Sequence, residues 1–175
     1  MTNKQKYRDF CKTEVDIPIF SKDWWLDSVC GLDNWDVVLV EKGGNIFATM
    51  PYQMTKKLGM TSIHTPKLTQ TQGIYFKYPK NQKYYKKLSF EKEMTEKILK
   101  QLLHFDSISQ LFDYTHTNLL PFYWAGFEIG VKYTYVIEKI TVEELESNFE
   151  TDIRRRRRKA ANAGVEVYES NDIAK

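Results

Sequence analysis

The feature that most constrains the fold is a pair of strand-like runs joined by two glycines. The first run, residues 35–41, holds the apolar stretch Val37-Val38-Leu39-Val40, and the second covers residues 45–56. Gly43-Gly44 between them can adopt the left-handed conformations that a tight hairpin turn needs. The pattern therefore predicts a β-hairpin. Pro51 inside the second run predicts an edge position or a bulge, because proline cannot donate a hydrogen bond to a neighbouring strand.

Apolar residues at helical spacing predict one long helix and several short ones. Phe90, Met94, Ile98 and Leu102 recur every four residues, and Leu99 and Leu103 widen the same stripe. Residues 89–103 are therefore predicted to form an amphipathic helix with Ser89 as its N-cap. Shorter helices are predicted at residues 3–12, after the capping box Thr141–Glu144, and at about 150–163. Two more are predicted from an N-cap at Ser21 to Gly31 and from an N-cap at Asn118 to Gly126.

The remaining segments predict strands and one long loop. Strands are expected at residues 59–66, 107–112, 127–137 and 165–168, with residues 16–20 extended before and after Pro18 and residues 67–88 forming a loop. Because helices and strands alternate after an opening meander, the predicted fold class is α/β (α+β), a mixed sheet flanked by helices. The chain ends on a new strand and a helix start. We therefore expect residues 1–163 to form one domain and residues 164–175 to begin a second, truncated or missing domain.

Composition excludes several classes of protein. With 42% hydrophobic and 28% charged residues, the 175-residue chain is neither disordered nor of low complexity. Its longest apolar run is strand-sized, so no membrane span is expected, and the first residues lack the apolar stretch of a signal peptide. These features predict a cytoplasmic protein. Cys11 and Cys30 have no metal-ligand spacing, so they are expected to be free thiols and no metal site is predicted. Common catalytic motifs are absent, and no catalytic residue is assigned.

Arginine is concentrated in one place. Apart from Arg8, every arginine lies in the run 154–158, and without that run the net charge changes from +3 to −2. Successive residues of a helix turn by 100°, so at least one guanidinium must face the protein or a neighbouring domain and needs an anionic partner. One interpretation is a site for a phosphate, pyrophosphate or nucleic acid, formed by Arg154, Arg155, Arg157, Arg158 and Lys159. The alternatives are a solvated helix that pairs with Glu150 or Asp152, and a docking surface for a second domain.

Two neighbouring segments are the other candidates for binding. The first offers hydroxyls, amides and a flexible backbone that could line a polar cleft: Thr69, Gln70, Thr71, Gln72 and Gly73. The second, residues 77–87, mixes five lysines with three tyrosines and could hold a nucleotide base or a single strand. Plain solvated loops are the alternative for both. We predict that the arginine helix and residues 69–73 converge on a phosphate-bearing ligand.

Several segments in order resemble one family. They are Ile17-Pro18-Ile19-Phe20 with Trp24-Trp25-Leu26, Trp35-Asp36-Val37-Val38-Leu39-Val40 with its Gly-Gly turn, Leu68-Thr69-Gln70-Thr71-Gln72-Gly73, Thr117-Asn118-Leu119-Leu120-Pro121-Phe122-Tyr123-Trp124, Tyr133-Thr134-Tyr135-Val136-Ile137, and the arginine helix with Gly164-Val165. The combination resembles the N-terminal half of bacterial GNAT-related acyltransferases close to the FemABX-type peptidoglycan aminoacyl transferases.

The resemblance implies a GNAT-like (acyl-CoA N-acyltransferase-like) fold and transfer of an acyl or aminoacyl group to an amine. Acyl-CoA or aminoacyl-tRNA would be the donor substrate, with no tightly bound cofactor, and the acceptor would be a small molecule or a peptidoglycan precursor. Proteins of this group bind the acceptor between two GNAT-type domains. The pyrophosphate motif Q/R-x-x-G-x-G/A is absent here, so this half alone is expected to be inactive. A non-catalytic module that binds nucleic acid, including tRNA, and a degenerate GNAT scaffold are the alternatives, and a homo-oligomer is compatible with either.

Overall fold

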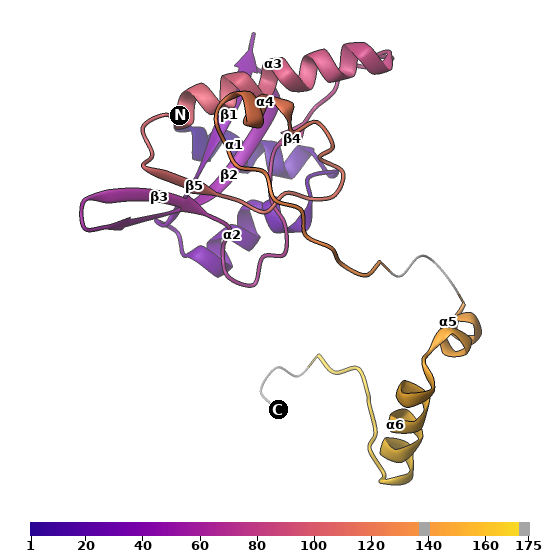
Figure 1. The fold of residues 1–175 in the computed structure, drawn as a ribbon. Coiled ribbons are helices and arrows are strands. Elements are labelled where there is room, and N and C mark those ends of the chain that lie inside the picture. Colours follow the sequence, from indigo (N-terminus) through magenta and orange to yellow (C-terminus); the bar gives the residue numbers. More distant parts are fainter. Residues whose placement is uncertain (137–140, 172–175) are drawn as a thin grey trace. The chain divides into compact units, whose positions relative to one another are not determined.

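The computed structural model describes residues 1–136 and 141–171, which belong to two compact units (Figure 1). Met1–Gly130 form the first unit and Val131–Lys175 the second. The units are described separately below. Among the described helices, none combines the length and the apolar character that crossing a membrane requires.

The first unit is built on a mixed five-stranded sheet. β1 (Trp35–Lys42), β2 (Asn45–Lys57) and β3 (Met60–His64) form an antiparallel meander, and β5 (Ser107–Ser109) pairs parallel with β3. The short strand β4 (Tyr75–Phe76) pairs antiparallel with β2. The predicted hairpin is confirmed, since Gly43 and Gly44 both have positive φ and join β1 to β2.

Helices pack on both faces of this sheet. α1 (Asn3–Thr13), the 3-10 turn η1 (Ile19–Ser21) and α2 (Asp23–Cys30) belong with one core, and α3 (Tyr84–Leu102) and α4 (Leu120–Trp124) with the other. Side chains alternate along a strand, so Val37 and Leu39 of β1 join the first core, while Val38 and Val40 join the second. This alternation explains why the apolar run of β1 is continuous, and the predicted mixed sheet flanked by helices is confirmed.

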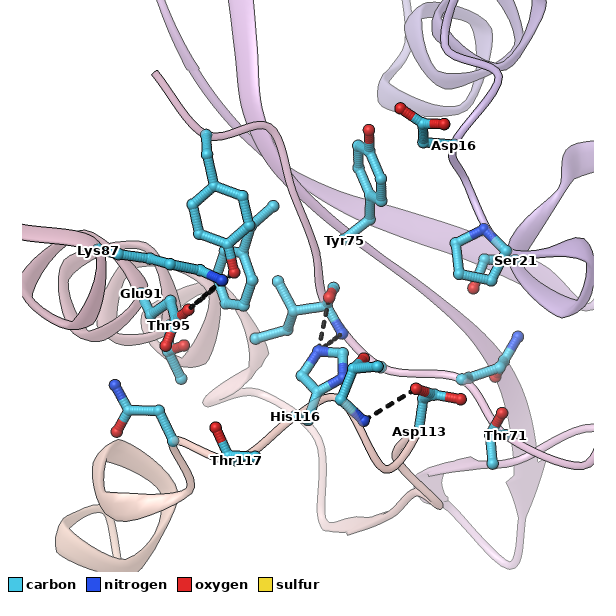
Figure 2. Close-up of a pocket in the computed structure, with 18 of the residues that line it drawn as sticks. Asp16, Ser21, Thr71, Tyr75, Lys87, Glu91, Thr95, Asp113, His116 and Thr117 are labelled. Atoms are coloured by element: carbon cyan, nitrogen blue, oxygen red, sulfur yellow. Dashed lines mark hydrogen bonds and ion pairs between the residues drawn. The ribbon is translucent and has the colours of Figure 1, made fainter. Parts of the chain in front are cut away.

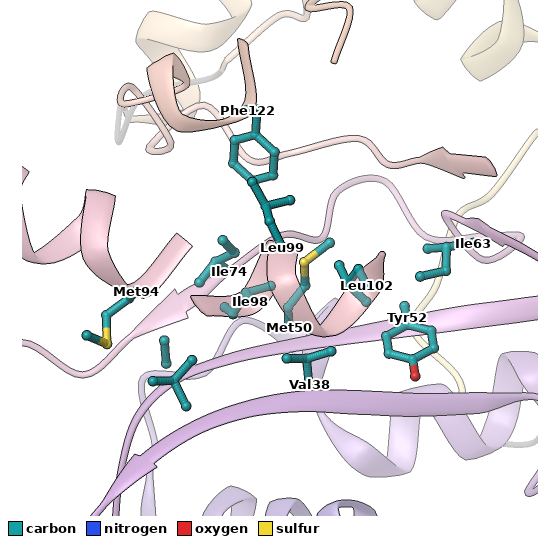
Figure 3. Close-up of a cluster of buried hydrophobic side chains, with 12 residues drawn as sticks. Val38, Met50, Tyr52, Ile63, Ile74, Met94, Ile98, Leu99, Leu102 and Phe122 are labelled. Atoms are coloured by element: carbon teal, nitrogen blue, oxygen red, sulfur yellow. The ribbon is translucent and has the colours of Figure 1, made fainter. Parts of the chain in front are cut away.

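The core beneath α3 follows the predicted stripe with one exception (Figure 3). Met94, Ile98 and Leu102 are buried and pack toward Val38 and Met50 of the sheet. Leu103 was expected to widen this stripe, but it is 81% exposed. It is the C-cap residue, at which the helical spacing ends and the side chain leaves the packed face.

Helix α3 starts earlier than predicted. Its N-cap is Lys83 instead of Ser89, whose hydroxyl donates to the carbonyl of Tyr85 one turn earlier. Residues 84–88 contain no glycine or proline, so nothing in them opposes extension of the helix. The predicted loop of residues 67–88 is therefore wrong at its C-terminal end, and it is also interrupted by β4.

Three other local predictions need correction. Ser21 lies in η1, so the segment around it is not simply extended, and Lys22 is the N-cap of α2. Leu119 takes the N-cap position predicted for Asn118, whose side-chain amide instead donates to the carbonyl of Leu88. Both residues have tertiary partners, since the backbone carbonyl of Ser21 accepts the Tyr7 hydroxyl.

Pro51 lies in the central strand β2, contrary to the edge position or bulge that was predicted. It faces Val37 of β1, and the only register shift between β1 and β2 lies at Val40/Glu41. On the other side of β2, β4 pairs at Ala48 and Thr49 and β3 pairs from Gln53 onward. The Pro51 carbonyl accepts the side-chain amide of Gln110 on that side. Because the nitrogen and the carbonyl of one strand residue point the same way, the missing N–H faces this gap in the ladder.

The described residues of the second unit form two helices and no strand. Val142–Asn148 form α5, and Thr141 and Glu144 make the predicted capping box. Thr151–Asn162 form α6, followed by Gly164 with φ of +74°. The strands predicted at 127–137 and 165–168 are absent over the described residues, because an extended segment needs a hydrogen-bonded neighbour and these have none. Residue 137 and residues 172–175, part of the predicted helix start, lie outside the described residues.

The packing of α3 predicts a sharp difference between two adjacent leucines. Leu102→Ala should lower the free energy of unfolding by about 2 to 5 kcal/mol, because the substitution leaves a cavity at a site that is 1% exposed. Leu103→Ala on the exposed neighbour should change it by no more than about 0.5 kcal/mol. Urea denaturation of both variants is the measurement. Equal losses in the two variants would contradict the packing described here.

Candidate functional site

A cavity of about 280 Å³ lies in the first unit, on the side of the sheet covered by α3 and α4 (Figure 2). Three segments enclose it: residues 71–78, the N-terminal half of α3, and residues 113–118. Residues near the start of α2 complete one side. Its polar and charged lining consists of Asp16, Ser21, Thr71, Gln72, Tyr75, Tyr78, Lys87, Glu91, Thr95, Asp113, Thr115, His116, Thr117 and Asn118.

The side chain of His116, from the 113–118 segment, contacts the backbone of Ile74 in the segment 71–78. Its Nε2 lies 2.6 Å from the carbonyl oxygen of Ile74 and 3.2 Å from the amide nitrogen of the same residue. The shorter contact favours a tautomer with the proton on Nε2, because two acceptors at that distance would repel each other. The lone pair is then on Nδ1, which is buried and has no hydrogen-bond partner among the described residues.

Burial also keeps this imidazole neutral. The cost of burying an imidazolium lowers the pKa of His116, and the contact with the Ile74 backbone and the charges of Asp113 and Glu91 offset this only in part. A neutral imidazole with an unpaired nitrogen has a lone pair that can accept a proton.

Glu91 places a carboxylate on the cavity wall formed by α3. It is only 9% exposed. Its Oε1 accepts the hydroxyl of Tyr78 at 2.7 Å, and the ammonium of Lys87, one turn earlier, lies 4.0 Å away. Figure 2 shows Lys87 reaching across toward this carboxylate. Burial and the Glu91 carboxylate raise the pKa of Tyr78, so the phenol stays protonated and donates.

Gly73 brings the backbone close to the side chains of His116 and Phe112. Its φ is +124°, a conformation that side chains rarely allow. A Cβ at this position would lie 3.0 Å from Cδ1 of Phe112 and 3.2 Å from Cε1 of His116. The position therefore requires glycine, and the absence of a side chain lets the imidazole ring pack against the strand.

The predicted polar loop contributes only part of the cavity. Thr71, Gln72 and Gly73 line it, whereas Thr69 and Gln70 do not. The Thr69 hydroxyl accepts the indole N–H of Trp25, and Gln70 is exposed. The Gln72 side chain is also structural in part, because its amide donates to the carbonyl of Phe20 and its oxygen accepts from Gln110.

The predicted arginine site lies on α6, in the second unit, and every arginine in it is exposed. Arg155 and Arg156 both pair with Asp152, at 2.8 and 2.7 Å, and Arg157 pairs with Glu146 at 2.6 Å. Among the described residues, no acid pairs with the side chains of Arg154, Arg158 or Lys159. The pairing with Asp152 agrees with the solvated-helix interpretation, but the second acid is Glu146 instead of Glu150. Convergence of α6 with residues 69–73 stays a prediction.

The lysine–tyrosine segment 77–87 has a mixed role. Tyr78 turns inward to Glu91, and the ammonium of Lys77 forms an ion pair with Glu14 at 2.6 Å. Tyr84 and Tyr85 are exposed on the first turn of α3. In the part of the chain that is described, no group of three or more His, Cys, Asp or Glu side chains could hold a metal ion.

Sequence patterns did not identify the two central side chains of the cavity. Glu91 carries a recognisable signal, since an acid at this position interrupts the apolar stripe between Phe90 and Met94 on the buried side of a helix. His116 carries no such signal, because its contact with Ile74 joins residues 42 positions apart.

The buried imidazole predicts an acid-sensitive fold. The lowered pKa of His116 means that its contribution to stability is fully present above the ordinary value of about 6.5 and is lost as the pH falls below it, because the unfolded chain binds the proton first. His116→Gln should reduce this loss in urea denaturation at a series of pH values. His104→Gln, at an exposed position, should retain it. An unchanged pH dependence in the His116 variant would contradict the assignment.

Comparison with known proteins gives little beyond these residues. No family model and no curated protein matches the chain. A solved structure of a ribosomal-protein-alanine N-acetyltransferase from Brucella melitensis biovar Abortus 2308 is similar to it with a TM-score of 0.38 and 9% identity, over 78% of this chain and 94% of that one. At this score and identity the similarity carries no weight for function, which has to come from the chain's own residues.

Proposed function

We propose that this chain is the N-terminal, substrate-binding part of a GNAT-related acyltransferase or aminoacyltransferase, with the cavity beside α3 as its acceptor site. The observation that carries the proposal is the neutral imidazole of His116 on the wall of a cavity that also holds the buried carboxylate of Glu91. Acyl transfer to an amine needs a base of this kind. The order of the family-like segments in the sequence supports the same class of reaction.

The chemistry assigns one role to each group. An amine nitrogen attacks the acyl carbon of the donor, a C–N bond forms, and the C–S bond of an acyl-CoA or the C–O bond of an aminoacyl-tRNA breaks. Nδ1 of His116 accepts the proton that the amine loses, and the leaving thiolate or alkoxide takes a proton from solvent. Glu91 binds charge on the acceptor, and Tyr78 and Lys87 hold its carboxylate in place.

Helix α6 is proposed to anchor phosphate groups of the donor. Arg154 and Arg158 are one turn apart and so share a face. Within residues 1–136 and 141–171 they have no acidic partner, whereas Arg155, Arg156 and Arg157 each have one. CoA and tRNA both carry phosphates that guanidinium groups bind in a bidentate manner.

The exposed arginines of α6 also favour a second candidate function. Arg154 and Arg158, which pair with no acid among the described residues, suit a non-catalytic module that binds the phosphate backbone of nucleic acid. Such a module would bind oligonucleotides with a steep loss of affinity as salt rises and would not bind CoA selectively. A scaffold without ligands would bind neither.

Transfer activity tests the acceptor site. The longest polypeptide that the gene encodes should be assayed with acetyl-CoA or aminoacyl-tRNA and a panel of amines. His116→Gln should lower kcat/KM by about 10²- to 10⁴-fold, the usual contribution of a general base, and should flatten the pH profile. His104→Gln is the matched control. A His116 variant with full activity would remove the imidazole from the reaction.

Phosphate binding tests the helix. The double variant Arg154→Gln/Arg158→Gln should bind CoA or tRNA about tenfold more weakly or worse, since each lost contact is a hydrogen bond to a charged group. Arg155→Gln/Arg156→Gln, which removes arginines that already pair with Asp152, should lose less. Equal binding by both double variants and the unmodified chain, all folded by circular dichroism, would leave only the solvated helix.

A further inference from the structure

The cavity beside α3 has an excess of negative charge in a chain whose net charge is +3. Asp16, Glu91 and Asp113 line it, and Lys87 is the one lysine or arginine among its lining residues. With His116 neutral, the lining therefore carries a net charge of −2. A phosphate would be repelled here, whereas an organic cation would be attracted.

The acids stand on two sides of the cavity. In Figure 2, Glu91 comes from α3 on one side, and Asp16 and Asp113 come from other segments on the opposite side. Oδ1 of Asp113 accepts the backbone N–H of Thr115, which fixes the orientation of that carboxylate. Two separated negative groups match a ligand with two separated positive groups better than they match a single charge.

A second, independent feature points to a ligand. Thr95 lies one turn after Glu91 on α3 and is only 2% exposed, yet it lines the cavity. Within residues 1–136 and 141–171 its hydroxyl makes no hydrogen bond, and it is not one of the side-chain polar atoms sealed from solvent. The hydroxyl is therefore open to the cavity, where it can accept a hydrogen bond from a ligand. An ammonium bound at Glu91 would donate to this hydroxyl as well.

Apolar side chains also line the cavity. Ile74 and Phe122 are both buried core residues that also line the cavity. A chain of methylene groups would contact them and leave water at a gain of roughly 0.8 kcal/mol for each methylene group.

We infer that the cavity binds a linear diamine or polyamine, with one ammonium on Glu91 and Thr95, the alkyl chain along Ile74 and Phe122, and the second amine toward Asp113 and His116. The assignment of this ligand as the acyl acceptor rests on the proposed function, but its binding does not. One end is held as a cation by the buried carboxylate. The other end lies near the neutral imidazole, where it can lose a proton.

Calorimetric titration of the full chain is the test, with 1,4-diaminobutane, spermidine, n-butylamine and inorganic phosphate as probes. The diamine and spermidine should bind at least about tenfold more tightly than butylamine, and more weakly as salt rises. Phosphate should not compete. Equal affinity for butylamine and the diamine, or no binding of either diamine or spermidine, would overturn the inference.

Variants on one helix separate the site from general charge effects. Glu91→Gln should weaken diamine binding about tenfold or more, since it removes the charge but keeps an oxygen for Tyr78. Glu93→Gln is the matched control, because Glu93 is exposed and pairs with Lys97. If Glu91→Gln does not fold, Thr95→Val serves as the test instead. This variant keeps the side-chain shape, removes the hydroxyl and should also weaken diamine binding. Unchanged affinity in a folded Glu91 or Thr95 variant would contradict the inference.

The outcome also distinguishes this inference from the proposed function. A diamine that binds as described but is never acylated by the full-length protein would contradict the acyltransferase and leave the binding site. Acylation of another amine without any binding of diamines would support the acyltransferase and contradict the diamine site.

Discussion

The packing of α3 against the sheet is the interaction on which the rest of the first unit depends. Ile98 and Leu102, at 0% and 1% exposure, attach the C-terminal half of this helix to β1 and β2. The N-terminal half of the same helix carries Lys87, Glu91 and Thr95 along one wall of the cavity. Because a helix is stiff over this length, the apolar half fixes where the polar half lies. The site and the core therefore share a single structural element.

Sequence patterns predicted those features that rest on local spacing. The β-hairpin, the buried stripe of Met94, Ile98 and Leu102, and the Thr141–Glu144 capping box all depend on residues close together in the chain, and all are present. The strands expected at 127–137 and 165–168 are absent over their described residues, because they depend on more than local spacing. Alternation of side chains predicts which face a strand would bury, but a strand also requires a neighbour, which no local pattern supplies.

The candidate site was predictable only in part for the same reason. Polar residues in a row drew attention to Thr71, Gln72 and Gly73, which do line the cavity. The residues that give it chemical character come together from distant segments. His116 meets Ile74 across 42 positions, and Glu91 meets Tyr78 across 13. A run of arginines is visible in the sequence itself, whereas the carboxylate of Glu91 and the partly buried imidazole of His116 come to line one cavity only when the chain folds.

The gap opposite Pro51 has a consequence for how the cavity is attached to the sheet. On the side of β2 away from β1, no described strand pairs with Pro51. The side-chain amide of Gln110 lies there and donates both to the Pro51 carbonyl and to the Gln72 side chain. Gln72 in turn reaches the Phe20 carbonyl. Hydrogen bonds between side-chain amides thus connect the backbone just before Gly73 to the central strand. A substitution of Gln110 alone would break this connection, whereas the backbone pairing of β2 with β1, β3 and β4 would remain.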